Sequence, residues 1–346
     1  MKKLETQRLW LREMRESDFS AVHSYASTSE NTVFMPWGPN TEEQTRAFLS
    51  LAAAEANRQP CVNYQYAVTL KSTGRLIGGC SLALSGDEAE LGWVLSLAEW
   101  NQGYGTEIGK ALLKFGFDEL NLHRIIARCD AENIASYRVM EKIGMLREGL
   151  FLESRPGRKG GGQAYGDTLS YAILKSDWDA QKEIAYYNSL PCVFNDFITL
   201  PTLSNGQIQL VCVAKKPPIP EKKWVPAYVF VVCKGSEKIG ELQLRIGYDS
   251  GLYGSNLYYG GQIGYSIDEA HRGNGYAAQA CRLLEPVAKA HQMETLLITN
   301  AHTNTASRRV CEKLGARLLR VARLPEWHDI YQRGHRFVNI FEWSLK

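Results

Sequence analysis

The order of apolar and polar positions predicts short strands alternating with amphipathic helices, and related patterns occur in both halves of the chain. In the first half, apolar runs bounded by turn residues predict strands at residues 8–12, 64–70, 75–84, 90–97, 124–129, 146–153 and 168–174. Helical spacing predicts helices at residues 16–26, 41–56, 106–120, 133–144 and 177–190. In the second half the same criteria predict strands at residues 228–232, 239–246 and 263–267, and a helix at residues 278–290 that Pro286 should kink.

A glycine-rich turn joins a predicted strand to a predicted helix in each half. The turns read Trp100-Asn101-Gln102-Gly103-Tyr104-Gly105-Thr106 and Arg272-Gly273-Asn274-Gly275-Tyr276-Ala277-Ala278. Backbone N–H groups at a helix N-terminus bind anions, so each turn is suited to a pyrophosphate. Because glycines also make ordinary turns, one such turn alone is weak evidence.

A second motif follows each turn about thirty residues later. It begins with an asparagine three residues before a serine, at Asn133 and Ser136 in the first half and at Asn304 and Ser307 in the second. That spacing places both side chains near the start of a helix, facing the same site. The alternative interpretation is ordinary helix capping.

The doubled pair of motifs resembles the GNAT superfamily of acetyl-CoA-dependent N-acetyltransferases. The family's loop pattern is Arg/Gln-x-x-Gly-x-Gly/Ala, which Arg272, Gly275 and Ala277 match fully. Gly103 and Gly105 match it in the first half, where Trp100 replaces the first polar residue. The opening Thr-Gln-Arg-Leu-Trp-Leu-Arg resembles the RimJ/RimL-like branch of the family. That branch tolerates a tryptophan at the loop position that Trp100 occupies. The resemblance covers nearly the whole chain and implies an α+β fold, with two tandem GNAT domains that each have a mixed, mostly antiparallel sheet flanked by helices.

The resemblance implies that acetyl-CoA binds along these motifs. The loops would hold the pyrophosphate, the preceding strand would offer backbone groups to the pantetheine arm, and the asparagine would meet the pantetheine end. The implied cofactor-binding residues are Val94, Leu95, Ser96, Gln102, Gly103, Tyr104, Gly105, Thr106, Asn133, Tyr137, Ser266, Ile267, Asp268, Arg272, Gly273, Asn274, Gly275, Tyr276, Ala277, Ala278, Asn304 and Ser307. For Tyr137 the alternative role, packing, is the favoured interpretation.

Transfer of an acetyl group to an amine needs a base for the ammonium proton and benefits from an acid for the departing thiolate. Glu90 lies on the strand before the first loop and is the candidate base, although an exposed strand carboxylate is an equally good interpretation. The resemblance makes Ser136 the candidate acid, because Met140 stands where many members of the family carry a tyrosine. With no activated nucleophile evident, we expect direct transfer in a ternary complex.

Composition excludes several other classes of function. The chain has 346 residues, with 45% hydrophobic and 22% charged residues and a net charge of +3, so it predicts two globular domains without a basic nucleic-acid surface. No run approaches the ~18 apolar residues of a membrane span, and the start has no apolar signal core. The eight scattered cysteines form no Cys-x-x-Cys pair, so we expect no metal site and reduced thiols in a cytoplasmic protein.

The halves are not equivalent in sequence. We expect an N-terminal domain at residues 1–178, a connector at 179–194, and a C-terminal domain at 195–346 that lacks the helical acceptor-binding segment. Counting back from the loops aligns Glu90 with Gln262, and an amide cannot accept the ammonium proton. The sequence therefore predicts an N-acetyltransferase active mainly in its N-terminal domain, with a small-molecule or peptide amine as acceptor. The alternative is a CoA-binding regulatory or scaffold protein with lapsed catalysis.

Overall fold

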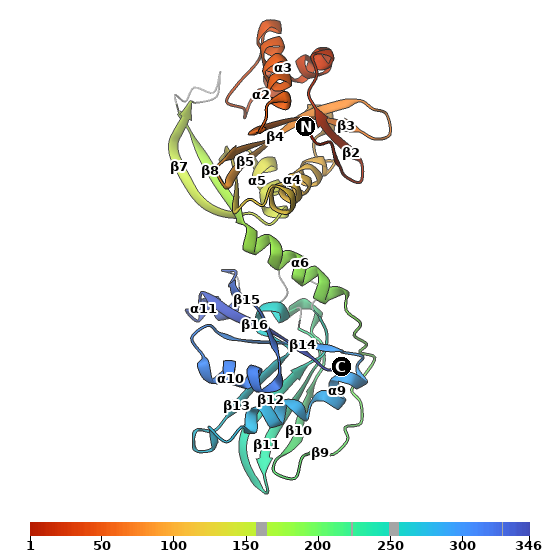
Figure 1. Ribbon diagram of the computed structural model, residues 1–346, viewed down its shortest axis with the longest axis vertical. Coiled ribbons are helices and arrows are strands. Elements are labelled where there is room, and N and C mark those ends of the chain that lie inside the picture. The colour runs from red at the N-terminus through yellow and green to blue at the C-terminus, as the bar shows by residue number, and fades with distance from the viewer. Residues whose placement is uncertain (157–164, 223, 249–255, 327) are drawn as a thin grey trace. The chain divides into compact units, whose positions relative to one another are not determined.

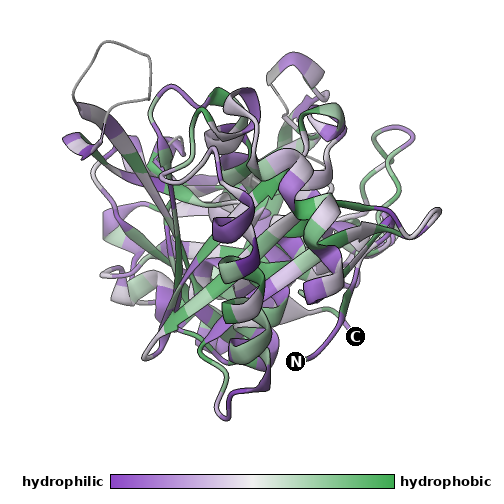
Figure 2. Ribbon diagram, turned by 90° about the horizontal axis from the view of Figure 1, so that it is seen from above, coloured by the Kyte–Doolittle hydropathy of each residue, from purple (hydrophilic) through white to green (hydrophobic). Residues whose placement is uncertain are grey.

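The computed structural model describes all residues of the chain except 157–164, 223, 249–255 and 327. It divides into two compact units, Met1–Trp178 and Asp179–Lys346 (Figure 1). Each unit combines antiparallel sheet with flanking helices, which confirms the expected fold class. Apolar segments, green in Figure 2, are concentrated on the strands, where the cores of both units lie.

The first unit is built on one eight-stranded sheet of order β1-β2-β3-β4-β5-β6-β8-β7, in which only the β5–β6 pair is parallel. Its strands are β1 (Leu4–Glu5), β2 (Leu9–Glu13), β3 (Asn63–Leu70), β4 (Leu76–Ser85), β5 (Glu88–Leu95), β6 (Arg124–Asp130), β7 (Leu146–Pro156) and β8 (Tyr165–Leu174). Its helices are α1 (Phe19–Ala26), α2 (Ser29–Thr32), α3 (Glu42–Asn57), α4 (Tyr104–Lys114) and α5 (Ile134–Lys142). Short 3-10 turns (Glu16–Asp18 and Leu97–Glu99) precede α1 and the glycine loop, and a π-helical turn (Phe115–Glu119) follows α4.

The two faces of this sheet have different helices. α4 and α5 pack on one face, where Leu91 of β5 and Ile125 of β6 are buried in the larger core. α1 and α3 pack on the other face, where Val94 of β5 joins Val22 and Leu49 in a smaller cluster. Because side chains alternate along a strand, Glu90 projects on the same face as Val94. The candidate base therefore lies on the face that carries the helices of residues 19–57.

Several predicted boundaries were wrong by a few residues. α4 begins at Tyr104 instead of Thr106, because Gly103, with φ of 80°, already serves as its N-cap. β5 ends at Leu95 instead of Leu97, because the amide of Leu97 turns to donate to the Asn31 side chain. The short elements β1 and α2 were missed, since two to four residues are too few to show a periodicity. The sequence Arg155-Pro-Gly-Arg-Lys-Gly-Gly-Gly predicts a basic, mobile loop. This prediction falls largely on residues 157–164, outside the described residues, although Arg155 and Pro156 belong to β7.

The second unit contains two sheets, of orders β13-β12-β11-β10-β9 and β14-β16-β15. Its strands are β9 (Leu203–Ser204), β10 (Gln209–Lys216), β11 (Ala227–Lys234), β12 (Glu237–Arg245), β13 (Ile263–Ile267), β14 (Thr295–Ala301), β15 (Arg317–Arg323) and β16 (Phe337–Ser344). Its helices are α6 (Lys175–Ser189), which starts in the first unit, α7 (Asn256–Gly260), α8 (Tyr276–Arg282), α9 (Glu285–Ala290), α10 (Thr305–Leu314) and α11 (Asp329–Gln332), with 3-10 turns at Pro220–Lys222 and Glu269–His271. As Pro286 predicted, the helix after the second loop is interrupted, into α8 and α9.

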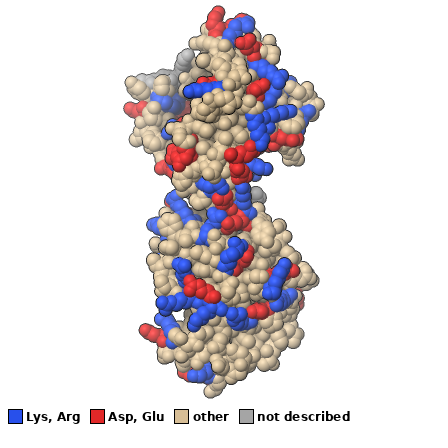
Figure 3. Space-filling view, viewed as in Figure 1, with Lys and Arg blue, Asp and Glu red and all other residues tan. Residues whose placement is uncertain are grey.

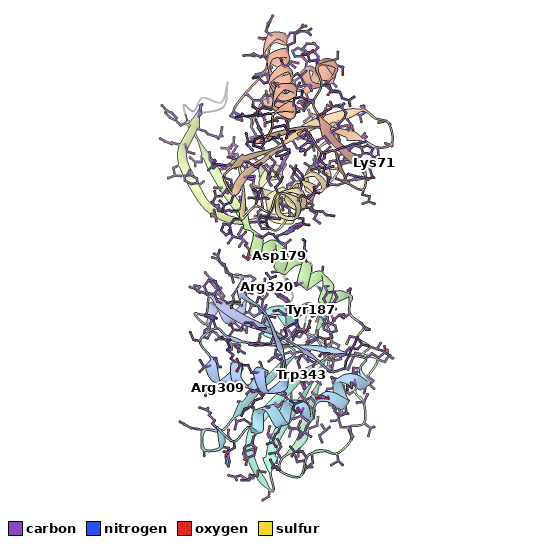
Figure 4. The ribbon with its side chains drawn as sticks, in the orientation of Figure 1. Lys71, Asp179, Tyr187, Arg309, Arg320 and Trp343 are labelled. Atoms are coloured by element: carbon purple, nitrogen blue, oxygen red, sulfur yellow. The ribbon has the colours of Figure 1, made fainter. Side chains whose placement is uncertain are left out.

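The second unit differs from the first between its long opening strands. Residues 217–226 join β10 to β11, whereas residues 14–62, with α1 to α3, join β2 to β3. The strand β10 was missed, and the expected helix-poor segment before β11 is in fact partly strand. The expected connector also has a packing role, because Glu183 of α6 forms an ion pair with Arg320 of β15 and Tyr187 donates a hydrogen bond to Glu342. Figure 4 labels Tyr187 and Arg320. Residues 179–194 thus lie within the second unit.

Candidate functional site

The first glycine loop is held in shape by the side chain of Trp100. Its indole Nε1–H donates to the carbonyl oxygen of Leu95, at the end of β5, over 2.9 Å. The chain then turns through Gly103, and the first helical bond of α4 runs from Glu107 N to Gly103 O over 3.2 Å. The N–H groups ahead of Glu107 therefore have no acceptor within the helix and are free for an anion.

The second loop repeats this geometry with a different residue. The Arg272 Nε–H donates to the carbonyl oxygen of Ile267 over 3.0 Å. Gly275, with φ of 77°, is the N-cap of α8, and Gln279 N donates to Gly275 O over 3.2 Å. Trp100 and Arg272 thus make equivalent hydrogen bonds to the end of the preceding strand. This explains how the first loop keeps its shape although it departs from the family pattern.

The polar side chains of both loops turn back onto the loop backbone. Gln102 Nε2 donates to Ala98 O over 3.1 Å, and Asn274 Nδ2 donates to His271 O over 3.1 Å. An anion at either loop would therefore meet backbone N–H groups of the first helical turn, at Tyr104, Gly105 and Thr106 or at Tyr276, Ala277 and Ala278. Gly273, with φ of 84°, and Gly103 give the loops the positive φ that other residues avoid.

Gly105 also has a packing role. A Cβ added there would stand 3.1 Å from Val139 Cγ2 of α5, so a side chain would press on the helix that carries Ser136. In the second unit Ala277 takes the corresponding position. The glycine at 105 is thus explained by helix packing as well as by anion binding.

A residue that sequence reasoning missed stands over the first loop. The Arg8 guanidinium forms an ion pair with Glu107 over 2.7 Å, donates to Gln102 O over 3.0 Å and lies over the Tyr104 ring. Burial raises the pKa of Glu107, but hydrogen bonds from Thr6 and Arg8 outweigh burial and hold that pKa below its ordinary value. Glu107 is therefore a structural anion in the first turn of α4. Arg8 therefore puts a cation beside the free N–H groups. The sequence could not predict this contact, because Arg8 and Glu107 are 99 positions apart in the chain.

The strands β5 and β6 separate beside the loop. They pair at Glu88, Ala89 and Glu90, and in the described chain no ladder pair follows Glu90. β4 continues to pair with β5 as far as Leu95, and β8 with β6 as far as Asp130, so the sheet opens into a fork at Glu90. An extended arm could enter such a fork and pair with the backbone of either strand.

The predicted pantetheine residues lie along one branch of this fork. Val94 and Leu95 end β5, and Ser96 follows. The Leu95 carbonyl already accepts hydrogen bonds from both Trp100 and the Asn31 side chain, and the Ser96 amide donates to Ile77 O. These backbone groups are therefore occupied, which leaves Val94 and the preceding residues as the better candidates.

Glu90 lies at the base of the fork and is paired with an arginine. Its carboxylate accepts from Arg128 Nη1 of β6 over 3.0 Å, and the two side chains are 43% and 49% exposed. A pair this exposed contributes about 0.2–1 kcal/mol, so it can be exchanged for another partner. Arg128 was missed, although the alternation of Arg124, Ile126 and Arg128 with buried residues is the signal that would have found it.

Asn133 and Ser136 lie at the start of α5, on the other face of the sheet from Glu90. Asn133 is the N-cap, and its Oδ1 accepts from the Ser136 amide over 3.1 Å, so the capping interpretation is correct for this side chain. The Ser136 hydroxyl lies beside Cys129 of β6, the other branch of the fork. Burial raises the pKa of the Cys129 thiol to about 11, with the Ser136 hydrogen bond opposing the rise. Tyr137 is half-buried against the core and has Arg138 over its ring.

In the second unit the corresponding groups are engaged. Gln262 is fully buried, its Nε2 donates to Gly247 O over 2.9 Å, and its Oε1 accepts from the Leu297 amide of β14. The Gln262 amide in turn donates to Leu297 O, so this residue links the two sheets of the second unit.

The serine of the second unit is also paired. Asn304 caps α10 as Asn133 caps α5, with 3.0 Å between its Oδ1 and the Ser307 amide. The Ser307 hydroxyl lies 2.8 Å from the Tyr265 hydroxyl of β13, a position that Trp93 takes in the first unit. Burial raises the pKa of Tyr265 well above its ordinary value, with the Ser307 hydrogen bond opposing the rise. Ser266 and Ile267 end β13, and Asp268 donates its amide to Ile239 O as Ser96 does to Ile77.

The loop and the fork of the first unit together suit a large anionic ligand with an extended arm. The first loop combines free N–H groups, a glycine N-cap and the nearby Arg8, and the fork has strand edges for an extended arm. Within the described residues, no group of three or more His, Cys, Asp or Glu side chains could hold a metal ion. Nor does any helix in that part of the chain have the length and apolarity to cross a membrane. Figure 3 shows basic and acidic side chains interspersed over the visible face.

Comparison with known proteins agrees with this geometry. The model of the acetyltransferase (GNAT) domain matches the chain twice, at residues 8–146 and 211–317. An uncharacterized N-acetyltransferase, YnaD, of Bacillus subtilis is 39% identical over 178 residues, which are 51% of this chain and 99% of that protein. A GNAT-family acetyltransferase structure from Bacillus anthracis is 38% identical, covers 50% of this chain and 99% of its own, and has a TM-score of 0.44. A structure of RimL, a ribosomal L7/L12 alpha-N-protein acetyltransferase in complex with coenzyme A, is 20% identical, covers 50% of this chain and 98% of its own, and has a TM-score of 0.44.

Proposed function

The chain belongs to the GNAT acetyltransferase family, and from that premise we propose that its first unit transfers an acetyl group directly to a primary amine, with Glu90 as base. The chain is an N-acetyltransferase that uses acetyl-CoA. The observation that carries the proposal is the position of Glu90 at the fork between β5 and β6. The acceptor is a small-molecule or peptide amine.

The proposed chemistry divides between the two faces of the sheet. Acetyl-CoA supplies the activated acetyl group as its thioester. On the face of α1 and α3, Glu90 takes the proton of the ammonium, so that the neutral nitrogen forms the C–N bond as the C–S bond breaks. On the opposite face, Ser136 donates its proton to the departing sulfur and regains one from solvent. Both residues border the same fork, although they come from opposite sides of the sheet.

The proposal makes the halves unequal. In the second unit Gln262 has both ends of its amide engaged and is buried, so it has no proton-accepting capacity to offer. Ten residues, 217–226, replace the segment that includes α1 to α3, which is our candidate for the acceptor-binding region. We propose that the second unit binds CoA at its loop and contributes little turnover.

The test is amine-dependent release of CoA by the full chain, measured over a panel of N-terminal peptides, aminoglycosides, polyamines and amino acids. Against the best acceptor, Glu90→Gln should lower kcat on the order of 10²–10⁴-fold with little change in acetyl-CoA affinity. Glu5→Gln is the matched control, because Glu5 is another ion-paired surface carboxylate of the same sheet, joined to Lys71 over 2.6 Å. It should keep wild-type turnover.

The two serines test which half is active. Ser136→Ala should lower kcat clearly more than Ser307→Ala. If Ser307→Ala is the crippling change and Glu90→Gln is silent, the active half is the second unit. If no amine in the panel stimulates CoA release, the choice of acceptor class is wrong and a binding or scaffold role gains support.

A further inference from the structure

We infer that the acceptor carries an anionic group close to its amine, and that Arg128 recognises this group in a pocket beside Glu90. The inference rests on the proposed function and adds the class of substrate to it. The observation behind the inference is that the Arg128 guanidinium forms an ion pair with Glu90 and also lines the pocket. The pocket has a volume of about 370 Å³ and is lined by Glu88, Arg124, Ile126, Arg128, Glu148, Gly149, Phe151 and Ser170.

The pocket lies on the sheet face of Glu90 and continues from it across three strands. Arg128 of β6 is in register with Ser170 of β8, and Ser170 is in register with Gly149 of β7. Because Ser170 has a small side chain and Gly149 has none, the sheet surface next to the Arg128 guanidinium is left open. The Phe151 ring forms an edge, 3.4 Å from where a Gly149 Cβ would stand. The space suits a molecule of about amino-acid size.

The charges around the pocket leave Arg128 as the exchangeable cation. Arg124 forms an ion pair with Glu148, and both line the pocket. Arg128 pairs with Glu90, and both side chains are about half exposed. Glu88 is exposed and lies two residues before Glu90 on β5, so the three carboxylates here outnumber the two guanidiniums by one.

The proposed proton transfer changes these charges at one place. When Glu90 takes the ammonium proton it becomes neutral, and Arg128 loses its counter-ion. A carboxylate or phosphate on the acceptor would then pair with Arg128, so that charge stays compensated throughout the transfer. An acceptor with several ammonium groups would instead place cations beside Arg124 and Arg128.

The test compares matched acceptors that differ in the anionic group. The pairs are β-alanine with β-alaninamide, and a peptide amide that begins with aspartate with the same peptide beginning with asparagine. These two arms separate a free amino acid from a peptide N-terminus as the source of the same chemistry. For each pair, the readout is the ratio of kcat/KM for the anionic member to that for the neutral member, in wild type and in variants. Comparing one pair across variants cancels the intrinsic reactivity of each amine.

Arg128→Gln should lower this ratio on the order of 10- to 100-fold, which is the usual loss for a hydrogen bond to a charged group. Arg128→Lys should retain part of the preference, because it keeps the charge. Arg147→Gln should leave the ratio unchanged, since Arg147 is an exposed arginine of β7 that does not line the pocket.

The outcomes separate the two proposals. A ratio that Arg128→Gln leaves unchanged, or a wild-type preference for polyamines that Arg128→Gln strengthens, overturns the inference about the anionic group and leaves the acetyltransferase proposal intact. If Glu90→Gln is silent on every acceptor, the underlying proposal fails instead. The thermal unfolding temperature of Arg128→Gln confirms that the variant is folded, which a half-exposed side chain leads us to expect.

Discussion

Trp100 and Arg272 make the same hydrogen bond in the two units, each from a side-chain N–H to the carbonyl oxygen five residues earlier. The bonds are 2.9 and 3.0 Å long and close the turn between the strand and the glycine loop. The first residue of the family's loop pattern thus anchors the loop in this chain. This position requires a side-chain N–H group that can reach the carbonyl oxygen five residues earlier, and both indole and guanidinium provide one.

We expect Trp100→Phe to lower the unfolding free energy of the first unit by about 0.5–1.5 kcal/mol through the lost hydrogen bond. Trp100→Arg should cost less, because Arg272 shows that a guanidinium can reach the corresponding carbonyl. Thermal unfolding and acetyl-CoA titration of both variants measure this. Equal losses from phenylalanine and arginine would mean that the indole matters for packing alone.

Gly103→Val should reduce acetyl-CoA affinity at the first loop. The valine would strain a backbone with φ of 80° and put a side chain where an anion approaches the N–H groups. Gly74→Val is the matched control, since Gly74 has φ of 70° and open space around it but lies in a distant turn. Calorimetric titration that finds equal affinity loss in both variants would attribute the effect to strain, and unchanged affinity in Gly103→Val and Gly275→Val would contradict the loop assignment.

We expect no covalent acetyl-enzyme. Burial raises the pKa of the Cys129 thiol, the cysteine at the fork, to about 11, so it is protonated and weakly nucleophilic near neutral pH. Intact-mass spectrometry after mixing with acetyl-CoA alone should show the unmodified mass. A stoichiometric acetyl group on a residue essential for turnover would overturn direct transfer.

Glu107→Gln should destabilise the first unit in a pH-dependent way. The pKa of Glu107 lies below its ordinary value of 4.5 in the folded state, so its stabilising effect is present above 4.5 and lost as the pH falls through the folded value. The difference in unfolding temperature between wild type and variant should therefore be full at pH 7 and shrink below pH 4.5. Glu42→Gln, at an exposed carboxylate of α3, should show little difference at any pH. A gap for Glu107→Gln that stays constant down to pH 3 would show that Glu107 acts through packing.

Gln262→Glu should destabilise the second unit without giving it activity. The substitution buries a charge where the amide donates to Gly247 O, and an uncompensated buried charge costs about 3–5 kcal/mol. Gln207→Glu is an exposed control in the same unit and should have little effect. Thermal unfolding of the full chain measures both. The prediction is contradicted if the double variant Gln262→Glu, Glu90→Gln is stable and turns over faster than Glu90→Gln alone. That result would show that the second unit lacks only a carboxylate for activity.

Local patterns in the sequence were enough to predict most elements of the first unit, whereas the strands β10, β14, β15 and β16 of the second unit were not predicted. The capping residues Thr41, Asn133 and Asn304 and the loop glycines act on atoms a few residues away, so their effect is readable from neighbours in the chain. The break at Pro286 has the same local cause. Short elements such as β1 and β9 were unreadable, because two residues carry no period.

The sequence by itself determined the family, the paired loop motifs and the contrast between Glu90 and Gln262, because each of these depends on residue type at a fixed spacing. Tertiary structure alone decided what surrounds those residues. It brought Arg8 to Glu107, Arg128 to Glu90, and Gln262 to both Gly247 and Leu297. These contacts join strands and helices that are adjacent only after the sheet has formed. The contacts follow from the order and register of the strands. Order and register depend on burying one whole face of the sheet, and no residue nearby in the sequence determines them.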